Sequence, residues 1–356
     1  MTKVSDISVA SSSAVSGKLN RSKPNRRRAR YFFVAMALLF PAVVFLGFFP
    51  SVQMMNEGSL EVHWLTHVHS AVMTSWLLLF ITQTILSVTG NLKFHRRLGL
   101  LSVVLAVLVV VMLGAVSFNL IIAHRAPEGS FTFDLLIGGF YEMFGFALFF
   151  TWGMLSRKKN LGAHKRLLTM ATIVLLEAAV DRIQMKHAFP SFGLAYPATN
   201  FIYADILYIP LFLYDWFTIK RIHKATLIGT AIVIACQIMV CTFYGSPSWH
   251  KFWYAKTAPL MEKVVEVKLT DTQSAPLLGH YESKIGKISI SQDNGRLYVQ
   301  FNGGEKQELG ATSETELYLK QETMEFSFVR GPEGKVTSAQ AKQIGRTNKM
   351  TRINQP

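Results

Sequence analysis

Residues 91–98 read NLKFHRRL, and residues 160–167 read NLGAHKRL. Five of the eight positions are identical, and one further position exchanges Arg for Lys. A weaker third copy, KRIHKATL, occupies residues 220–227. Each octamer is basic, contains a histidine and follows a long apolar segment. The repeat therefore marks the turns around which the chain is organised.

Seven apolar runs flank these turns and precede an ordinary soluble sequence. About 20 apolar residues in a helix cross the ~30 Å hydrocarbon core of a bilayer. The runs lie at 31–50, 67–89, 98–123, 134–154, 167–187, 201–218 and 225–244. The sequence predicts an all-α membrane bundle of seven transmembrane helices at residues 31–244, with the lipid bilayer as its first partner.

Basic residues are confined to alternate loops. The loops that hold the octamers carry eleven Lys and Arg residues, whereas loops 51–66 and 124–133 carry only Arg125. The positive-inside rule then places the N-terminus in the cytoplasm and the C-terminus outside it. Residues 1–30, rich in Ser and then in Arg, are predicted to be a cytoplasmic tail rather than a nucleic-acid-binding arm.

Histidines and cations of the octamers are predicted to lie at three cytoplasmic corners. The corner residues are His95, Arg96, Arg97, His164, Lys165, Arg166 and His223. An Asn at the start of a copy is suited to cap a helix, and basic side chains hold a corner in the anionic headgroup layer. Topology alone explains the repeat. A site in which the three histidines bind a metal or a phosphate remains an alternative.

Two acidic residues lie inside the apolar runs, where a charge needs a partner or a purpose. Glu142 and Glu177 are almost equally far from the turn between their spans, which predicts a common depth. Asp181 follows Glu177 by one helical turn, and Arg182 is the nearest counter-ion. Facing carboxylates share a proton or bind a cation. The alternative is a salt-bridge network that only joins helices.

The second run contributes histidines to the same outer half of the membrane. His69, Trp76 and Gln83 are spaced by seven and predict a stripe that faces the bundle interior. The candidate metal ligands are His63, His67, His69, Glu142, Glu177 and Asp181. Imidazole and carboxylate suit a transition metal, and two histidines suit a haem. Interfacial histidines that bind only water and backbone are the alternative.

Residues 60–225 resemble a group of uncharacterised bacterial multi-pass membrane proteins. The resemblance rests on His67-Val-His69, Trp76, Gln83, HRRLG at 95–99 and HKRLL at 164–168. The resemblance implies a membrane bundle in a bacterial inner membrane but no particular activity. Dihaem cytochromes b differ, because no histidine of this chain lies deep in a span.

The C-terminal third changes character. Residues 245–262 are rich in aromatic residues and are predicted to be an interfacial linker. In residues 263–356, alternating apolar residues and turns such as Asn302-Gly303-Gly304 predict an antiparallel β-barrel. LLGHYES at 277–283 and GRLYVQFNG at 295–303 resemble the lipocalin-like domain that follows penicillin-binding-protein-like serine hydrolases. The hydrolase is absent, since the one Ser-x-x-Lys, Ser156 to Lys159, falls in a charged turn.

Three functions remain open from the sequence. The favoured one is a non-catalytic protein whose bundle displays an extracytoplasmic barrel that binds a small apolar or envelope ligand, or a partner. A metal- or haem-dependent membrane oxidoreductase is the second. A proton-coupled transporter of a small solute, using the buried acids, is the third.

Overall fold

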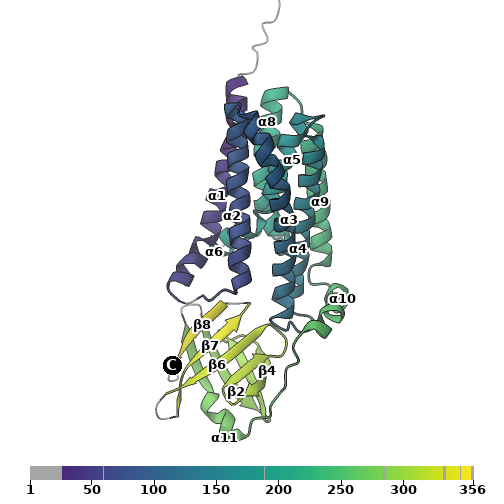
Figure 1. Ribbon diagram of the computed structural model, residues 1–356. Helices are drawn as coiled ribbons and strands as arrows, with labels where there is room; N and C mark the ends of the chain where they lie inside the picture. Colours follow the sequence, from purple (N-terminus) through teal and green to yellow (C-terminus); the bar gives the residue numbers. More distant parts are fainter. Residues whose placement is uncertain are drawn as a thin grey trace, which may run out of the picture.

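A bundle of helices and a β-barrel stand end to end in the computed structural model (Figure 1). The structure describes residues 26–58, 60–187, 189–283, 286–331, 334–344 and 346–353. The predicted tail at residues 1–30 lies outside this part of the chain, apart from the backbone of 26–30. We call the two ends of the bundle the barrel end and the corner end.

Long helices form most of the bundle. They are α1 (Arg26–Asn56), α2 (Trp64–Thr89), α3 (Leu92–Ile122), α4 (Thr132–Ser156) and α9 (Lys224–Phe243). A sixth segment, Ala198–Ile219, runs through α7 (Ala198–Asp205), a short 3-10 turn (Ile206–Tyr208) and α8 (Ile209–Ile219). Within the described ranges, these six segments are long and apolar enough to cross a membrane.

The predicted fifth span, 167–187, is not one continuous helix. It divides into α5 (Leu161–Val174) and α6 (Glu177–His187), with Leu175 and Leu176 in a turn between them. Neither Gly nor Pro stands at this break. The preceding β-branched residues Thr172 to Val174 weaken helix propensity locally. Of the seven predicted spans, six correspond to described segments that are long enough to cross a membrane, and the fifth is divided into two shorter helices.

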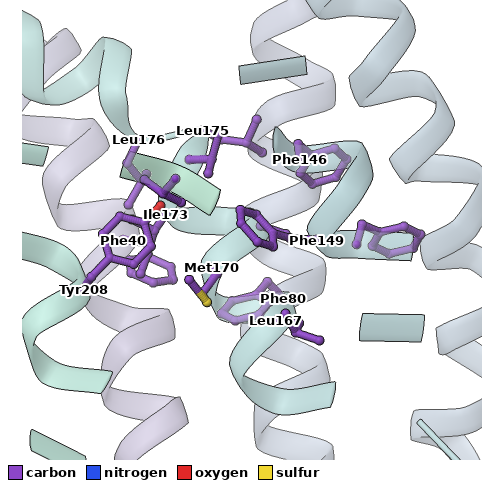
Figure 2. Close-up of a cluster of buried hydrophobic side chains, with 14 of the residues drawn as sticks. Phe40, Phe80, Phe146, Phe149, Leu167, Met170, Ile173, Leu175, Leu176 and Tyr208 are labelled. Carbon is purple, nitrogen blue, oxygen red and sulfur yellow. The ribbon is translucent and has the colours of Figure 1, made fainter. Parts of the chain in front are cut away.

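Glycine lets the second half of this interrupted segment pack tightly on α1. A Cβ atom at Gly47 would overlap the carbonyl oxygen of Ala179 in α6. The first half packs between α4 and α9 instead. Figure 2 shows the apolar cluster at the break, where Leu175 and Leu176 join Phe40, Phe146 and Met170. The core therefore fixes α5 and α6 to different neighbours.

The repeated octamers form helix corners, as predicted. Asn91 and Asn160 are the N-caps of α3 and α5, and their side chains accept hydrogen bonds from Phe94 N and Ala163 N, at 3.3 and 2.9 Å. Four residues after each Asn, a histidine Nδ1 donates to a carbonyl near the end of the preceding helix. His95 pairs with Gln83 O at 3.2 Å and His164 with Gly153 O at 2.9 Å.

The third copy works differently. His223 is itself the N-cap of α9, and its Nδ1 accepts a hydrogen bond from Ala225 N at 3.0 Å. Its ring also approaches Gly162 of the second corner. His95 and His164 interact electrostatically, so all three corners meet at one end of the bundle. Arg96, Arg97 and Lys165 are exposed there, whereas Arg166 is buried.

Eight strands in the described part of residues 279–353 close into an antiparallel barrel. They are β1 (Gly279–Ser283), β2 (Gly286–Asp293), β3 (Arg296–Phe301), β4 (Lys306–Ser313), β5 (Glu316–Leu319), β6 (Met324–Arg330), β7 (Val336–Gln343) and β8 (Arg346–Ile353). Each strand pairs with the next, and β8 returns to β1. The predicted barrel is confirmed. Alternate residues such as Ile288, Ile290 and Val299 point inward and build a core separate from that of the bundle.

The barrel docks on the loop between α3 and α4. Arg125 donates to Glu325 of β6 at 2.7 Å, and the Ser130 hydroxyl donates to Glu322 at 2.7 Å. The hydroxyl groups of Thr132 and Thr323 are 3.2 Å apart and buried. Because these contacts join two separate segments, they fix the barrel over one end of the bundle.

Candidate functional site

Polar side chains gather inside the bundle around the break between α5 and α6. We call them the polar cluster: Glu142, Glu177, Asp181, Arg182, Asn200, Asp205, Tyr208 and Gln237. They come from α4, α6, α7, the following 3-10 turn and α9. Segments far apart in the sequence therefore converge on this point.

Glu142 and Glu177 form the centre of the cluster. The two carboxylates interact electrostatically, which confirms the predicted proximity. Glu177 is the first residue of α6. The backbone amide of Ala178, in the first turn of α6, faces the Glu142 carboxylate. A helix N-terminus carries free N–H groups and a partial positive charge, so it favours an acidic side chain there. The break thus gives Glu142 a partner that a continuous helix would not provide.

Arg182, about one helical turn beyond Glu177 on α6, is the one cation among the described members of the polar cluster. Arg182 interacts with Glu142 and Asp181, donates to Ala178 O at 2.6 Å and stacks 4.4 Å from the centre of the Phe48 ring. Tyr196 hydrogen-bonds Asp181. Arg182 is thus the predicted counter-ion, and it is shared between two acids.

The remaining acid comes from α7. Asp205 accepts a hydrogen bond from Gln237 of α9 at 2.9 Å and interacts with Glu177. Asn200, only 2% exposed, donates from Nδ2 to Glu177 at 3.5 Å. With Glu142, Glu177, Asp181 and Asp205 against one Arg, the described cluster holds more acidic than basic groups.

Several polar atoms of the cluster are buried without a hydrogen-bond partner in the part of the chain that the structure describes. They are Asp181 Oδ1, Arg182 Nε, Asn200 Oδ1 and the Tyr208 hydroxyl. Tyr208 is 3% exposed and interacts with Asp205 and Glu177. Buried polar atoms are rarely left unpaired, because desolvation costs about 1–3 kcal/mol for each. Such atoms in one place indicate that a small polar species completes the cluster.

The predicted stripe on α2 faces the interior. Trp76 is 3% exposed, donates from Nε1 to Thr172 Oγ1 at 3.3 Å and packs edge-on against Phe146. Gln83 and His69 hold buried side-chain atoms without partners among the described residues. His69 interacts electrostatically with Arg182, which places it at the margin of the polar cluster.

The other two predicted ligands on α2 lie on the surface. His63 and His67 are exposed, and His63 accepts from Leu65 N at 3.3 Å as the N-cap of α2. No group of three or more His, Cys, Asp or Glu residues in the described ranges is arranged to hold a metal ion. The metal and haem site therefore stays a prediction from the sequence.

His124 lies at the junction with the barrel and is half-buried. Burial lowers the pKa of its imidazole, Lys342 of β7 lowers the pKa further, and Glu325 acts in the opposite direction. His63 lies near enough to interact with it. Burial and Lys342 therefore disfavour the protonated imidazole beside the docking contacts of Arg125 and Glu325.

Sequence reasoning missed one buried ion pair and one buried hydrogen bond. Arg166 donates to Asp215 of α8, and Asp215 also accepts from His223 N at 2.9 Å and from Thr226 Oγ1 at 2.6 Å. At the barrel end, His250 Nε2 lies 2.8 Å from Asp134 Oδ1. The signal was present, since Asp215 falls inside an apolar run as Glu142 does.

The barrel interior is filled by its own side chains, among them the fully buried Tyr281 and Phe326. A hollow of about 440 Å³ lies on its wall beside His280, Ser289 and Asn302. Comparison with protein-family models and with curated proteins finds no match. The two predicted resemblances are therefore neither supported nor opposed, and the functional argument rests on geometry.

Proposed function

We propose that the protein is a multi-pass membrane protein whose bundle binds a small monovalent cation, the proton included, in the polar cluster. The barrel is a fixed cap on the extracytoplasmic side. The observation that carries the proposal is the pair of buried, unpartnered atoms Asn200 Oδ1 and Tyr208 OH beside Glu177. An acceptor oxygen next to carboxylates is completed by a donor or a cation.

Charge supports a cation over an anion. The described cluster has four carboxylates and one guanidinium, with Arg346 of β8 near enough to interact with Arg182, and bare like charges repel strongly away from water. A bound cation or a shared proton relieves that repulsion. An anion would add to it. The alternative of a purely structural network leaves the unpaired oxygens of Asp181 and Asn200 without an explanation.

The barrel is proposed to serve as a fixed cap on the bundle and not as a catalytic domain. Buried side chains such as Tyr281 and Phe326 occupy its interior, and we place the cation site in the bundle, while a ligand of the barrel stays a prediction from the sequence. The contacts of Arg125 and Ser130 hold it at the barrel end. Its outer wall remains available to a partner in the envelope.

The test uses purified full-length protein and a cation panel at constant ionic strength. Na⁺, K⁺ and methylammonium are compared with choline, a larger cation that has no N–H donor. A cation at about 100 times its Kd stabilises the folded state by about 2.7 kcal/mol. We expect one small cation, or acidification alone, to raise the Tm of the wild type. Glu177→Gln should lose this response.

The matched control is Glu61→Gln, which neutralises an exposed acid before α2. It should respond as the wild type does. If no small cation and no pH change separates Glu177→Gln from Glu61→Gln, the cluster is structural and the proposal is wrong.

The interrupted helix favours a second candidate, proton-coupled movement of the cation across the membrane. Transporters often place such breaks at their binding sites, where the halves of a helix can move separately. In this structure the corner end is closed by apolar side chains such as Leu167 and Met170 and by the Arg166–Asp215 pair. Proteoliposomes with a luminal pH dye test this candidate: an imposed gradient should decay faster with wild type than with Glu177→Gln.

A further inference from the structure

An apolar groove runs along the outside of the bundle between α4 and α9. Its volume is about 220 Å³. It is lined by apolar and aromatic side chains, including Phe144, Leu148, Cys236, Met239, Phe243 and Trp249. Trp249 belongs to α10 (Pro247–Thr257), which lies beside the junction of bundle and barrel (Figure 1). The groove is thus closed at one end by a helix that is not part of a span.

The groove opens toward the surroundings of the helices rather than toward the polar cluster. Phe144 is 63% and Met239 50% exposed on the two helices that form its walls. Both helices are long and apolar enough to cross a membrane. Acyl chains therefore surround the opening, and an apolar groove in that setting fits a chain segment better than a water-soluble ligand.

Helix α10 has the character of an interfacial helix. Trp249 donates from Nε1 to Phe133 O at 2.7 Å, and Trp253 packs on Phe140 with ring centroids 5.1 Å apart. These contacts anchor α10 at the ends of α3 and α4. Aromatic side chains of this kind settle at the headgroup level of a bilayer. The predicted interfacial linker thus contains a helix with a fixed place beside the groove.

Positive charge accompanies the aromatic residues of α10. Lys256 follows Trp249 by seven residues, so the two share one face of the helix. Lys256 is exposed and its Nζ lies 5.9 Å from the centre of the Phe252 ring, and Lys251 is also exposed. The Trp253 indole N–H, next to Trp249, has no acceptor among the residues that the structure describes. The exposed cations, and not this buried indole N–H, are the groups of α10 that can meet an anionic headgroup.

We propose that this groove binds one acyl chain of an anionic phospholipid, whose headgroup lies on α10 against Lys256. The chain fills the space between Phe144 and Met239. The site is on the outside of the bundle, and the proposal does not rest on cation binding in the polar cluster. Tyr141, which also lines the groove, accepts a hydrogen bond from Gln237 of that cluster at 3.5 Å.

The test is native mass spectrometry of the full-length protein with equal amounts of phosphatidylglycerol and phosphatidylethanolamine. Wild type should retain the anionic lipid in preference. Near a membrane one lysine adds about fivefold to the affinity for anionic lipid, so Lys256→Gln should lower the preference by about fivefold at most. Lys349→Gln, an exposed lysine on β8, is the charge control and should leave the preference unchanged.

The acyl-chain half of the proposal is tested by Cys236→Phe, which fills the groove from α9. Its matched control is Cys241→Phe on the same helix, where the side chain is exposed and lies outside the groove. Cys236→Phe should lose bound lipid of both kinds, and Cys241→Phe should retain it. Thermal melts establish that both variants are folded. Equal retention by these two variants, or equal binding of the two lipids to wild type, would overturn the proposal.

Discussion

Arg166 and Asp215 form an ion pair that is almost completely buried at the corner end of the bundle. Arg166 comes from the second basic octamer and Asp215 from the end of α8, so the pair joins two of the three corners. Asp215 also accepts hydrogen bonds from His223 N and Thr226 Oγ1, which belong to the third corner. The repeated motif therefore has a role beyond holding a turn in the headgroup layer. Arg166, the one buried cation of the octamers, joins neighbouring helical hairpins.

Breaking this pair should strongly destabilise the bundle. Asp215→Asn leaves the buried Arg166 guanidinium without a counter-ion, a change that costs about 3–5 kcal/mol in buried pairs. The thermal midpoint of the purified protein measures the effect. Lys165→Gln removes an exposed charge from the same octamer and should change stability little. Similar thermal midpoints for the two variants would show that the Arg166–Asp215 pair does not stabilise the bundle.

The close contact of α6 with α1 should tolerate no side chain at position 47. Gly47→Ala places a Cβ against the carbonyl oxygen of Ala179 and should cost about 1–3 kcal/mol through overpacking. Gly138→Ala, in α4, adds a Cβ that meets nothing within 4 Å. Helix propensity then stabilises the control by up to about 1 kcal/mol. Chemical unfolding in detergent compares the two, and equal effects would mean that α6 does not need this contact.

Acid should weaken the docking of the barrel through His124. Its pKa in the docked state lies below the ordinary value of 6.5, so the undocked state takes up the proton first. Docking is therefore fully favourable above that value and loses stability as the pH falls through it. Between about pH 7.5 and about pH 5.5, deuterium exchange at residues 123–131, corrected for its intrinsic pH dependence, should rise in wild type.

The variant His124→Gln removes this titration and should flatten the profile. The exposed His63 nearby is the internal comparison, and His63→Gln should keep the rise because it serves chiefly as the N-cap of α2. An identical pH profile in wild type and His124→Gln would exclude His124 as the group that responds.

Sidedness is predicted from the loop charges. A reporter inserted at Asn160 should behave as cytoplasmic, and one fused after Pro356 as extracytoplasmic, because eleven basic residues lie in one set of loops and one in the other. This experiment also tests the interrupted segment. The two reporters lie on opposite sides of the membrane only if α5 and α6 together cross it. Reporters on the same side would show that they do not.

The sequence allowed most of the fold to be predicted. Long apolar runs and alternating strands have strong periodic signals, and the bundle and barrel follow from them. The break at Leu175 and Leu176 had no such signal, because neither Gly nor Pro stands there and the run stays apolar. It arises from tertiary packing, in which α5 fits between α4 and α9 while α6 follows Gly47 on α1.

The candidate site was predicted in part. Symmetry about the 155–166 turn was enough to place Glu142 beside Glu177. The contributions of Asn200, Asp205 and Tyr208 were not foreseen as one group, since they depend on how α7 and the following 3-10 turn enter the bundle. The predicted ligand-binding role of the barrel stays a prediction, because strand patterns do not determine how much of the interior the side chains fill.

The most direct test of the account is infrared difference spectroscopy of the buried carboxyl groups. A protonated carboxyl group away from water has its own C=O stretching band. We expect a band of this kind in wild type that shifts or disappears when the stabilising cation is added or the pH is raised. The Glu142→Gln/Glu177→Gln variant should lack the band, while Glu61→Gln should retain it. Spectra of wild type and of the Glu142→Gln/Glu177→Gln variant that are identical at every pH and with every cation would contradict the claim that these acids bind a proton or a cation.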